Sequence, residues 1–498
     1  MSALTDRLHE VTGRRETTAD VDAHSVLADV LGGVGTPADA AGGTVTFTGA
    51  DPVVPSTLRL GTAAGVGLAA KSVAMAALWR HRTGQTQDVA MDLRVAPHRL
   101  CPFYDRKWEL LGGYPPTSTA EPHPAMAFSF YRTADDRWVL PQNMYPGLRR
   151  HALSLLGSPD TKEAVGAAIG RWRAAELEQA AAEAGVVFPM LRTLPEFLAE
   201  QQYREHLADL PLIEVERIGD SAPEPFTPAP TDPLDGIRAL GMGKVIAGAG
   251  IGRTLALHGA DVLNIWRPTE QEHENVYYSA NVGVRSTLLD PDTPDGRARL
   301  ENLLHGADVF YHNRRPRLID RLGLGPEQVA ALRPGIVHVT ASLHGLTGPW
   351  SDRPGFDQTA GTVTGMMLLE GDRDRPRLPP ILVVNDYLVP WLASVGVARA
   401  LQRRAEHGGS YRVHVSLTRT ALWILGLGIL DKQWARATAG ATERHRYPDP
   451  ETFRAETPCG DYQGVTDQVW MSRTPGRYRT LLVPRGSCRP EWRADRAG

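Results

Sequence analysis

A glycine-rich stretch at residues 244–268, KVIAGAGIGRTLALHGADVLNIWRP, has the residue types that could bind a phosphate. It reads as a strand, a turn, a helix and a second strand, and the N–H groups at a helix N-terminus attract anions. A dinucleotide-binding fold needs G-x-G-x-x-G and an acidic residue about 20 positions further on. Here the third glycine is replaced by Arg253 or Leu255, depending on the register, and Trp266 ends the second strand. The stretch therefore predicts a tight backbone turn against a neighbour or ligand, not a site for NAD or FAD.

The composition and the cysteines argue against several other classes of protein. A formal net charge of −3 over 498 residues gives no electrostatic reason to expect binding to nucleic acid or to a membrane surface. Cys101, Cys459 and Cys488 have the spacing of neither a zinc site nor a disulfide framework, so no metal site is expected. The N-terminus lacks the apolar core of a signal peptide, and no stretch approaches the ~20 apolar residues that span a bilayer. These features predict a cytoplasmic protein.

Five candidate strands follow residue 237, with helical stretches between several of them. They lie at 244–247, 261–266, 307–311, 336–341 and 411–417. This alternation predicts an α/β fold with a doubly wound, mostly parallel, Rossmann-like sheet. A smaller α+β domain precedes it, where FSFYRTADDRWVLP indicates a hairpin around Asp135 and Asp136 and RWRAAELEQAAAEAG indicates an amphipathic helix.

The chain divides into segments by composition and pattern. Five prolines between positions 223 and 233 disfavour both helix and sheet, so this stretch predicts an extended linker. The expected segments are a loosely attached lead-in (1–50), a helix–strand unit that belongs with the large domain (51–123), the small α+β domain (124–220), the proline-rich linker (221–236), the Rossmann-like domain (237–435) and a C-terminal tail with little order (436–498).

One unit of the sequence occurs twice. At an offset of 324 residues, HRTGQTQDVAMDL (81–93) lies over AEHGGSYRVHVSL (405–417), and each follows a helical stretch. The same helix–turn–strand unit is therefore predicted in two copies. In this register Asp386 falls opposite Thr62, so only one copy has a carboxylate at that position.

Several motifs in series resemble the class III CoA-transferases, a superfamily that includes formyl-CoA and carnitine CoA-transferases and α-methylacyl-CoA racemase. They are AGAGIGRTLALHGADVLNIWRP, NVGVRSTLLD, ADVFYHNRRPRLIDRLGL, RPGIVHVTASLHGLTGPWSDRPGFD and the helix beginning NDYLVPW. The resemblance covers residues 230–420, and residues 55–230 resemble the later part of the same family's chain. The order is thus permuted, and a circular permutation with overlap would explain both the repeat and the length.

The resemblance implies that Asp386, in VVNDYLVP, attacks an acyl-CoA thioester. A carboxylate suits this role because it is ionised at neutral pH and forms an anhydride that divides one acyl transfer into easier steps. The products are a mixed aspartyl anhydride and a CoA thiolate, and an aspartyl-CoA thioester follows. The residues alone leave an alternative open: Asp386 is an ordinary helix N-cap, with Pro390 in the first helical turn.

The resemblance also implies a set of CoA-binding positions. Arginine side chains match the geometry of phosphate oxygens, whereas HNRRPR could equally be a solvated basic turn. The implied CoA-binding residues are Ala247, Gly248, Arg267, Arg285, Asn313, Arg314 and Arg321.

This sequence departs from the family's pattern beside the expected acyl group. Ile246 replaces a glutamine found in formyl-CoA transferases, and Trp266, Arg314 and Arg317 replace other family residues. Racemases carry a histidine where this chain has Phe356, and phenylalanine cannot carry a proton. His344 is a candidate substitute, with a structural role as its alternative. Ile246, His344 and Phe356 are the residues predicted to surround the acyl group.

The sequence therefore predicts a cytoplasmic CoA-transferase that moves CoA between an acyl-CoA and a carboxylic acid through Asp386. The CoA thioester enters as substrate, and no permanently bound cofactor is expected. The family implies a homodimer. Two alternatives remain open at this point: a racemase, isomerase or lyase acting on acyl-CoA, and a non-catalytic CoA-binding or scaffold protein.

Overall fold

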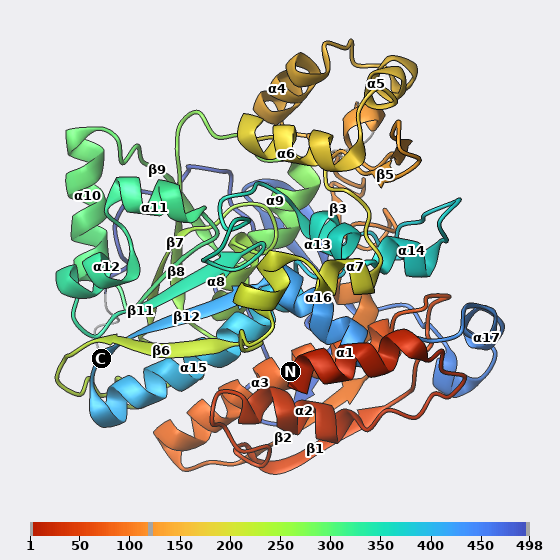
Figure 1. Cartoon of the computed structure of the whole chain (residues 1–498). Coiled ribbons are helices and arrows are strands. Elements are labelled where there is room, and N and C mark those ends of the chain that lie inside the picture. The colour runs from red at the N-terminus through yellow and green to blue at the C-terminus, as the bar shows by residue number, and fades with distance from the viewer. Residues whose placement is uncertain (1–2, 118–122, 495–498) are drawn as a thin grey trace.

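The computed structural model describes residues 3–117 and 123–494, and a sheet of seven strands forms its centre (Figure 1). All neighbouring strands in this sheet are parallel except β6, which runs antiparallel to β12. In spatial order the strands are β6 (Glu214–Gly219), β12 (Ser410–Ser416), β11 (Val337–Ser342), β10 (Val309–His312), β7 (Arg238–Met242), β8 (Asp261–Trp266) and β9 (Arg285–Leu288).

Helices cover both faces of this sheet, because its strands bury apolar side chains on both sides. One face packs against α8 (Ala249–Leu257) and α15 (Leu388–His407), and the other packs against α10 (Pro294–His305), α11 (Pro316–Leu322) and α12 (Pro326–Leu332). Ala239 and Leu240 on β7 point to opposite faces and belong to different apolar clusters. The predicted α/β class is confirmed.

Four of the five predicted strands lie within two residues of β8, β10, β11 and β12. The prediction for 244–247 was wrong, since β7 ends at Met242 and residues 245–248 form a turn. The chain must reverse tightly here, because a Cβ on Gly243 would lie 2.4 Å from the carbonyl oxygen of Gly248. Val245 has a φ of +58°, a conformation that no strand residue adopts.

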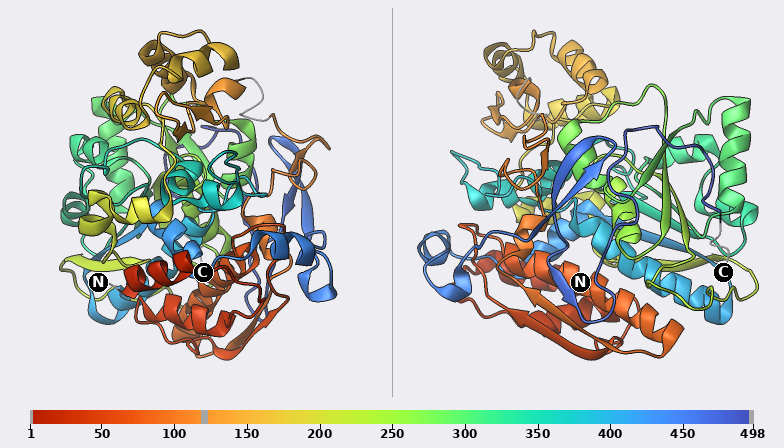
Figure 2. Two further views of the ribbon diagram at one scale, coloured as in Figure 1. Left: turned by 45° about the vertical axis from the view of Figure 1, so that its right-hand side comes forward. Right: turned by 180° about the vertical axis from the view of Figure 1, so that it is seen from behind.

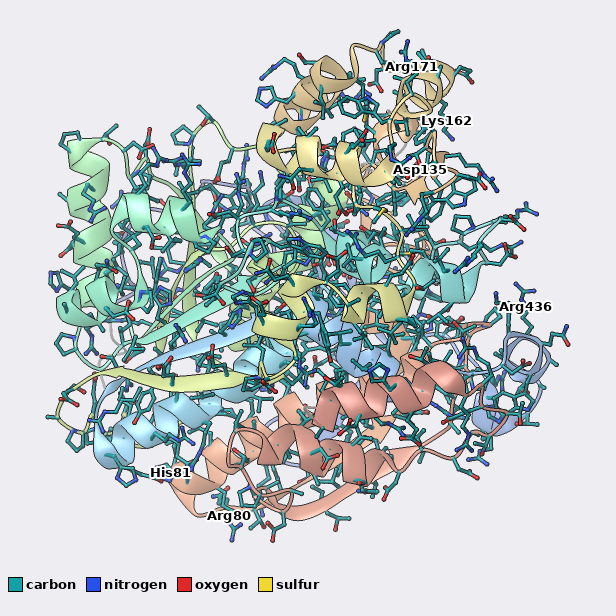
Figure 3. The ribbon with its side chains drawn as sticks, viewed as in Figure 1. Arg80, His81, Asp135, Lys162, Arg171 and Arg436 are labelled. Atoms are coloured by element: carbon teal, nitrogen blue, oxygen red, sulfur yellow. The ribbon has the colours of Figure 1, made fainter. Side chains whose placement is uncertain are left out.

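The small domain contains the predicted hairpin and helix. Strand β4 (Tyr131–Arg132) pairs antiparallel with β5 (Trp138–Val139), and Asp136 in the turn has a φ of +58°. Three helices, α4 (Pro146–Leu156), α5 (Lys162–Ile169) and α6 (Ala174–Ala184), bury a separate apolar core with this hairpin. Figure 3 labels Asp135 in the turn, where its carboxylate accepts a hydrogen bond from the backbone N–H of Ala174 at 3.0 Å.

Residues 3–50 pack firmly, contrary to the expectation of a loosely attached lead-in. Leu8 and Leu27 are buried in the main apolar core because the helices that carry them lie against the large domain. The elements of this region and of the unit that follows are α1 (Ala3–Gly13), α2 (Ala23–Gly32), β1 (Gly42–Thr48), α3 (Leu60–Thr83) and β2 (Gln87–Asp92).

The C-terminal region is also ordered, although little order was expected. Strand β15 (Val469–Met471) pairs with β2, which itself pairs with β1, and β14 (Gly460–Val465) lies between β13 (Thr452–Thr457) and β3 (Leu110–Leu111). These strands lie in front when the molecule is seen from behind (Figure 2, right). The tail therefore bridges segments far apart in the sequence. The linker at 221–236, in contrast, contains no helix or strand, as predicted.

Six further α-helices complete the described part of the chain. They are α7 (Leu194–Leu198), α9 (Glu274–Ala280), α13 (Asp357–Thr364), α14 (Met366–Glu370), α16 (Leu417–Gly426) and α17 (Lys432–Thr438).

The two helices of the internal repeat, α3 and α15, pack side by side (Figure 1). Arg80 and His81, labelled in Figure 3, mark the last turn of α3. Helix α3 is long and apolar enough to cross a membrane, which was not predicted from the sequence. However, 94% of its most apolar stretch is buried inside the protein. Small residues allow this close packing: a Cβ on Gly67 would lie 2.6 Å from Cδ2 of Leu388 and 3.2 Å from Cε3 of Trp391.

We expect Gly67→Leu to destabilise the protein by about 1–3 kcal/mol, because added carbon atoms overpack a close helix–helix contact. Gly32→Leu is the matched control, since a Cβ at Gly32, also in a helix, would meet nothing within 4 Å. Urea unfolding followed by circular dichroism measures both free energies. Equal effects of the two substitutions would contradict the importance of the α3–α15 contact.

Candidate active site

Asp386 lies in the turn before α15, and its side chain is free for chemistry. Tyr387, not Asp386, occupies the N-cap position, and no side chain caps this helix end. Among the described residues the Asp386 carboxylate has no hydrogen-bond partner, although the residue is only 5% exposed. The alternative that Asp386 is an ordinary helix cap is therefore wrong.

The carboxylate of Asp357 fixes this turn. Its Oδ2 accepts hydrogen bonds from the backbone N–H groups of Val384 at 3.0 Å, Asn385 at 2.5 Å and Asp386 at 2.8 Å. Asp357 is the first residue of α13 and is almost fully buried. Three N–H groups that converge on one buried oxygen leave the backbone of the turn little freedom. Asp357 thus holds Asp386 in place without using the Asp386 side chain.

The two carboxylates perturb each other's ionisation. Burial raises the pKa of Asp386 well above its usual range, and the nearby charge of Asp357 raises it further. Burial also raises the pKa of Asp357, to about 6, although the three backbone N–H groups favour its charged form. Asp386 is therefore a poorly solvated carboxylate. Such a group is a stronger nucleophile when ionised than one in water, but it holds a proton more readily.

The repeated unit contains a turn held in the same way. The carboxylate of Asp51 accepts hydrogen bonds from the backbone N–H of Gly61 at 2.8 Å and of Thr62 at 2.7 Å. At the offset of 324 residues, these two positions correspond to Asn385 and Asp386. Both copies thus keep a buried carboxylate at the start of the long helix: Asp51 binds the first turn of α3, whereas Asp357 binds the turn before α15. Only the second copy presents a further carboxylate, Asp386. The permuted order of the chain stays a prediction.

The glycine-rich turn lies beside Asp386 and is held by side chains from neighbouring strand ends. The side-chain amide of Asn313 accepts from the N–H of Lys244 at 3.0 Å and donates to the carbonyl of Lys244 at 2.8 Å. Glu272 accepts from the N–H of Val245 at 2.8 Å. A Cβ on Gly248, which caps α8, would lie 2.4 Å from the Asn313 side chain. The close backbone approach expected from the sequence is confirmed.

A cavity of about 370 Å³ opens on one side of Asp386. Its walls come from both the N-terminal half and the large domain, and most of them are apolar or aromatic. They include Phe103, Tyr104, Phe128 and Tyr145 from the first half, and Ile246 and Phe356 from the second.

A second cavity, of about 190 Å³, opens on the other side of Asp386 and is richer in cations. Ala247, Asn313 and Arg314 line it, together with Arg315 and Arg353, which the sequence analysis did not single out. Val245, Phe356 and Asp386 line both cavities. The aspartate therefore lies at the junction of an apolar space and a basic one.

Tyr145 links the two halves of the chain at the apolar cavity. Its hydroxyl donates a short hydrogen bond to Glu272, and its ring lies 5.9 Å from Phe356 and 4.5 Å from His273. Burial lowers the pKa of His273 to about 4, so its imidazole is neutral at pH 7. His273 and Tyr145 are site residues that the sequence did not reveal.

Three of the arginines predicted to bind CoA line neither cavity. Arg267 pairs with Asp292, and Arg285 pairs with Asp261 at 2.9 Å. Arg321 is exposed on α11. Their role in CoA binding therefore stays a prediction.

His344 is also separate from Asp386. It is buried, and its Nδ1 lies 2.8 Å from the hydroxyl of Thr418. It borders a different, much smaller cavity of about 20 Å³. Among the described residues, no group of three His, Cys, Asp or Glu side chains is placed to hold a metal ion.

The residues missed by sequence reasoning differ in how they could have been found. Asp357 ends the motif RPGFD, so a carboxylate near Asp386 had a signal in the sequence. Phe103 and Tyr104 had none, because they lie over 280 residues from Asp386 and nothing local indicates their cavity.

The structure is thus an α/β fold in which the buried Asp386 borders both an apolar and a basic cavity. The chain belongs to CoA-transferase family III, whose sequence profile matches residues 28–209 and 234–472. The two matched segments cover most of the chain and include both halves of the internal repeat.

Curated relatives match parts of the chain. An acetyl-coenzyme A transferase of Hypoxylon pulicicidum is 32% identical over 45% of this chain and 38% of its own length. A succinyl-CoA–D-citramalate CoA-transferase of Chloroflexus aurantiacus is 29% identical over 39% of this chain and 52% of its own. A formyl-CoA:oxalate CoA-transferase of Streptomyces avermitilis is 29% identical over 41% of this chain and 52% of its own length. The chain thus spans about half the length, or less, of these relatives.

Solved structures match over a similar share. Rv3272 of Mycobacterium tuberculosis, in an orthorhombic crystal form, is 27% identical over 39% of this chain and 56% of its own, with a TM-score of 0.36. A CAIB/BAIF family protein of Brucella suis is 23% identical over 47% of this chain and 65% of its own, also with a TM-score of 0.36.

We expect Asp386→Asn to stabilise the protein at pH 8 by about 1–3 kcal/mol, the usual scale for relieving a buried unpaired polar group. The native pKa of Asp386 is raised, so the folded state keeps a proton that the unfolded state loses. Stability therefore falls as pH rises from the ordinary carboxyl range through the raised pKa, and the variant escapes this loss.

Thermal unfolding at pH 5 and pH 8 measures the difference, which should be larger at pH 8. Asp374→Asn is the control, because the Asp374 side chain is 96% exposed. A benefit that is the same at both pH values would contradict the buried and perturbed state of Asp386.

Proposed function

We propose that this protein is a CoA-transferase that moves CoA from an acyl-CoA to a carboxylic acid, with Asp386 as the nucleophile. The observation that carries the proposal is the place of Asp386 at the junction of two cavities of different character. A CoA thioester has the same two parts, an acyl group on one side of the reacting carbon and a long phosphorylated thiol on the other.

The first half of the reaction forms an aspartyl anhydride. A carboxylate oxygen of Asp386 attacks the thioester carbonyl carbon, the carbon–sulfur bond breaks, and CoA leaves as a thiolate. The thiolate then attacks the side-chain carbonyl carbon of Asp386. The donor acid leaves as a carboxylate, and an aspartyl-CoA thioester remains.

The second half reverses these steps with the acceptor. The acceptor carboxylate attacks the aspartyl thioester carbon, so a new anhydride forms and the thiolate leaves again. The thiolate attacks the acceptor's acyl carbon and frees the Asp386 carboxylate. No net proton or electron is exchanged, so these steps use no permanently bound cofactor.

The surroundings of Asp386 favour this route over hydrolysis. The carboxylate is buried and has no hydrogen-bond partner among the described residues, so little solvation must be lost when it attacks. The backbone of its turn is held by Asp357, which keeps the nucleophile in position through several covalent steps.

The basic cavity is the proposed path of the CoA portion. Ala247 lies where backbone passes close to Asp386, and Asn313 and Arg314 line the wall beyond it. Arg314 is paired with Glu270, whereas Arg315 is exposed and donates to the carbonyl of Asp352 at 3.2 Å. An exposed guanidinium at a cavity wall suits an entering phosphate.

The names of the relatives support CoA transfer in general, since they include succinyl-CoA and formyl-CoA transferases. A homodimer and a cytoplasmic location remain part of the proposal.

A proton-transfer reaction on acyl-CoA is a second candidate, because His273 lines the same cavity as Asp386. Phe356 cannot carry a proton, and His344 borders another cavity, so His273 is the histidine to consider. Uptake of deuterium at the acyl α-carbon, lost in His273→Phe, would favour this reaction over transfer.

We expect an acyl-CoA to acylate Asp386, so that hydroxylamine traps the adduct on the peptide 381–390, detected by mass spectrometry. Asp386→Asn should lower acyl exchange by at least about 1,000-fold, because the nucleophile is lost. Asp374→Asn, at an exposed position, should keep the wild-type rate. A trapped adduct elsewhere, or full activity in Asp386→Asn, would refute the proposed mechanism.

We also expect Arg315→Ala to raise KM for acyl-CoA about ten-fold with kcat unchanged, since one charge-assisted contact contributes about 1.5–3 kcal/mol. Arg299→Ala is the control, because Arg299 is an exposed residue on α10 and lines neither cavity. Steady-state kinetics at two salt concentrations measures both variants. An unchanged KM in Arg315→Ala would argue against the basic cavity as the CoA path.

A further inference from the structure

The apolar cavity beside Asp386 restricts which acyl groups can react there. Its walls carry five Phe or Tyr side chains, and Met144, Val276 and Leu382 add further apolar surface. Pockets of this size and lining bind small molecules mainly by burying apolar surface. The cavity is thus suited to an acyl group that has apolar surface to bury.

The charges around the cavity disfavour a second carboxylate on the substrate. Asp357 is buried behind the turn of Asp386, and Glu272 is half-buried at the Tyr145 hydroxyl, although neither lines the cavity itself. Among the described residues that line the cavity, Arg106 is the only Lys or Arg, and it is exposed. A buried anion without a cation to pair with is costly. An acyl group that ends in a carboxylate would meet the Asp386 carboxylate and, among the described residues that line the cavity, no buried Lys or Arg.

The polar side chains in the wall do not change this picture. The side-chain amide of Gln358 donates to the carbonyl of Leu382 at 2.8 Å, so its N–H group is already bonded to another residue of the cavity wall. Lys244 lies 4.5 Å from the centre of the Tyr145 ring, beside Glu272, and does not line the cavity.

Four of the five Phe and Tyr side chains that line the cavity come from the half of the chain that lacks Asp386. Phe103, Tyr104, Phe128 and Tyr145 all precede the linker, whereas Asp386 follows it. Thr62 stands at the equivalent position in that first half, so this half presents no second nucleophile. Its contribution to the site is the surface that the acyl group contacts.

We infer that the protein acts on uncharged, apolar acyl groups of medium-chain or aryl type, and that the aromatic side chains of Phe103, Tyr104, Phe128 and Tyr145 select them. This rests on the proposed function, since it assigns the acyl group for the same site. Acids with a second carboxylate, such as those in the names of the succinyl-CoA relatives, would be poor substrates.

Isotope exchange between an acyl-CoA and its own labelled acid tests this without knowledge of the natural acceptor. Phenylacetyl-CoA and octanoyl-CoA should exchange with kcat/KM at least about ten-fold above that of succinyl-CoA, because burial of an apolar side chain contributes about 1.5–3 kcal/mol. Equal or faster exchange by succinyl-CoA would overturn the inference while leaving CoA transfer intact.

Tyr104→Ala should lower phenylacetyl exchange about ten-fold more than it lowers succinyl exchange, since it removes an aromatic side chain from the acyl cavity. Tyr104 is 45% exposed, so the substitution does not open the protein core. Tyr114→Ala is the matched control, because Tyr114 is 77% exposed and lies outside the cavity. Equal losses for both acyl groups in Tyr104→Ala would contradict a role in selection.

Binding separates this inference from the proposed function. Calorimetry with Asp386→Asn, which cannot form the anhydride, should show phenylacetyl-CoA bound about ten-fold more tightly than succinyl-CoA. If the wild type exchanges no acyl group but this preference holds, CoA transfer fails and the acyl selectivity stands. If the variant binds both thioesters equally, the acyl selectivity fails.

Discussion

The carboxylate of Asp357, which accepts three consecutive backbone N–H groups, is the interaction on which the site depends. The backbone N–H groups at the start of a helix lack acceptors within the helix, and a nearby side chain usually accepts from them. Here the Asp357 carboxylate does so. Because this demand is met from α13, the side chain of Asp386 is left free and buried. The same negative charge raises the pKa of Asp386. Asp357 therefore positions Asp386 and adds to the effect of burial on its pKa.

The two halves of the chain divide the work of the site. Both contain a long helix whose N-terminal end is held by a buried carboxylate, Asp51 in one and Asp357 in the other. The helices pack closely through small residues such as Gly67, and this contact keeps the first half against the second. One half supplies Asp386, the proposed nucleophile, and the other supplies most of the aromatic side chains of the apolar cavity. Both halves thus line one cavity, and the hydrogen bond between Tyr145 and Glu272 joins them beside it.

The fold followed from the sequence wherever a short apolar run had turn residues on both sides, as at 261–266 and 336–341. The strand predicted at 244–247 was wrong, because its apolar residues belong to a turn in which Val245 has a positive φ. The prediction failed again for the C-terminal region, where β13 and β14 form a local hairpin that was not predicted, and where β14 and β15 also pair with the distant strands β3 and β2. Pairing over such distances leaves no local pattern in the chain.

The sequence by itself determined the α/β class and the glycine-rich turn, because each depends on local pattern, and motifs in series singled out Asp386 as the candidate nucleophile. Only the tertiary structure decided what surrounds that aspartate. It brought Asn313 and Arg314 to one side and Tyr145 to the other, and it paired Arg285 with Asp261. The physical reason is that burial, charge pairing and cavity shape are set by residues far apart in the chain. Their mutual distances exist only once the two halves have packed.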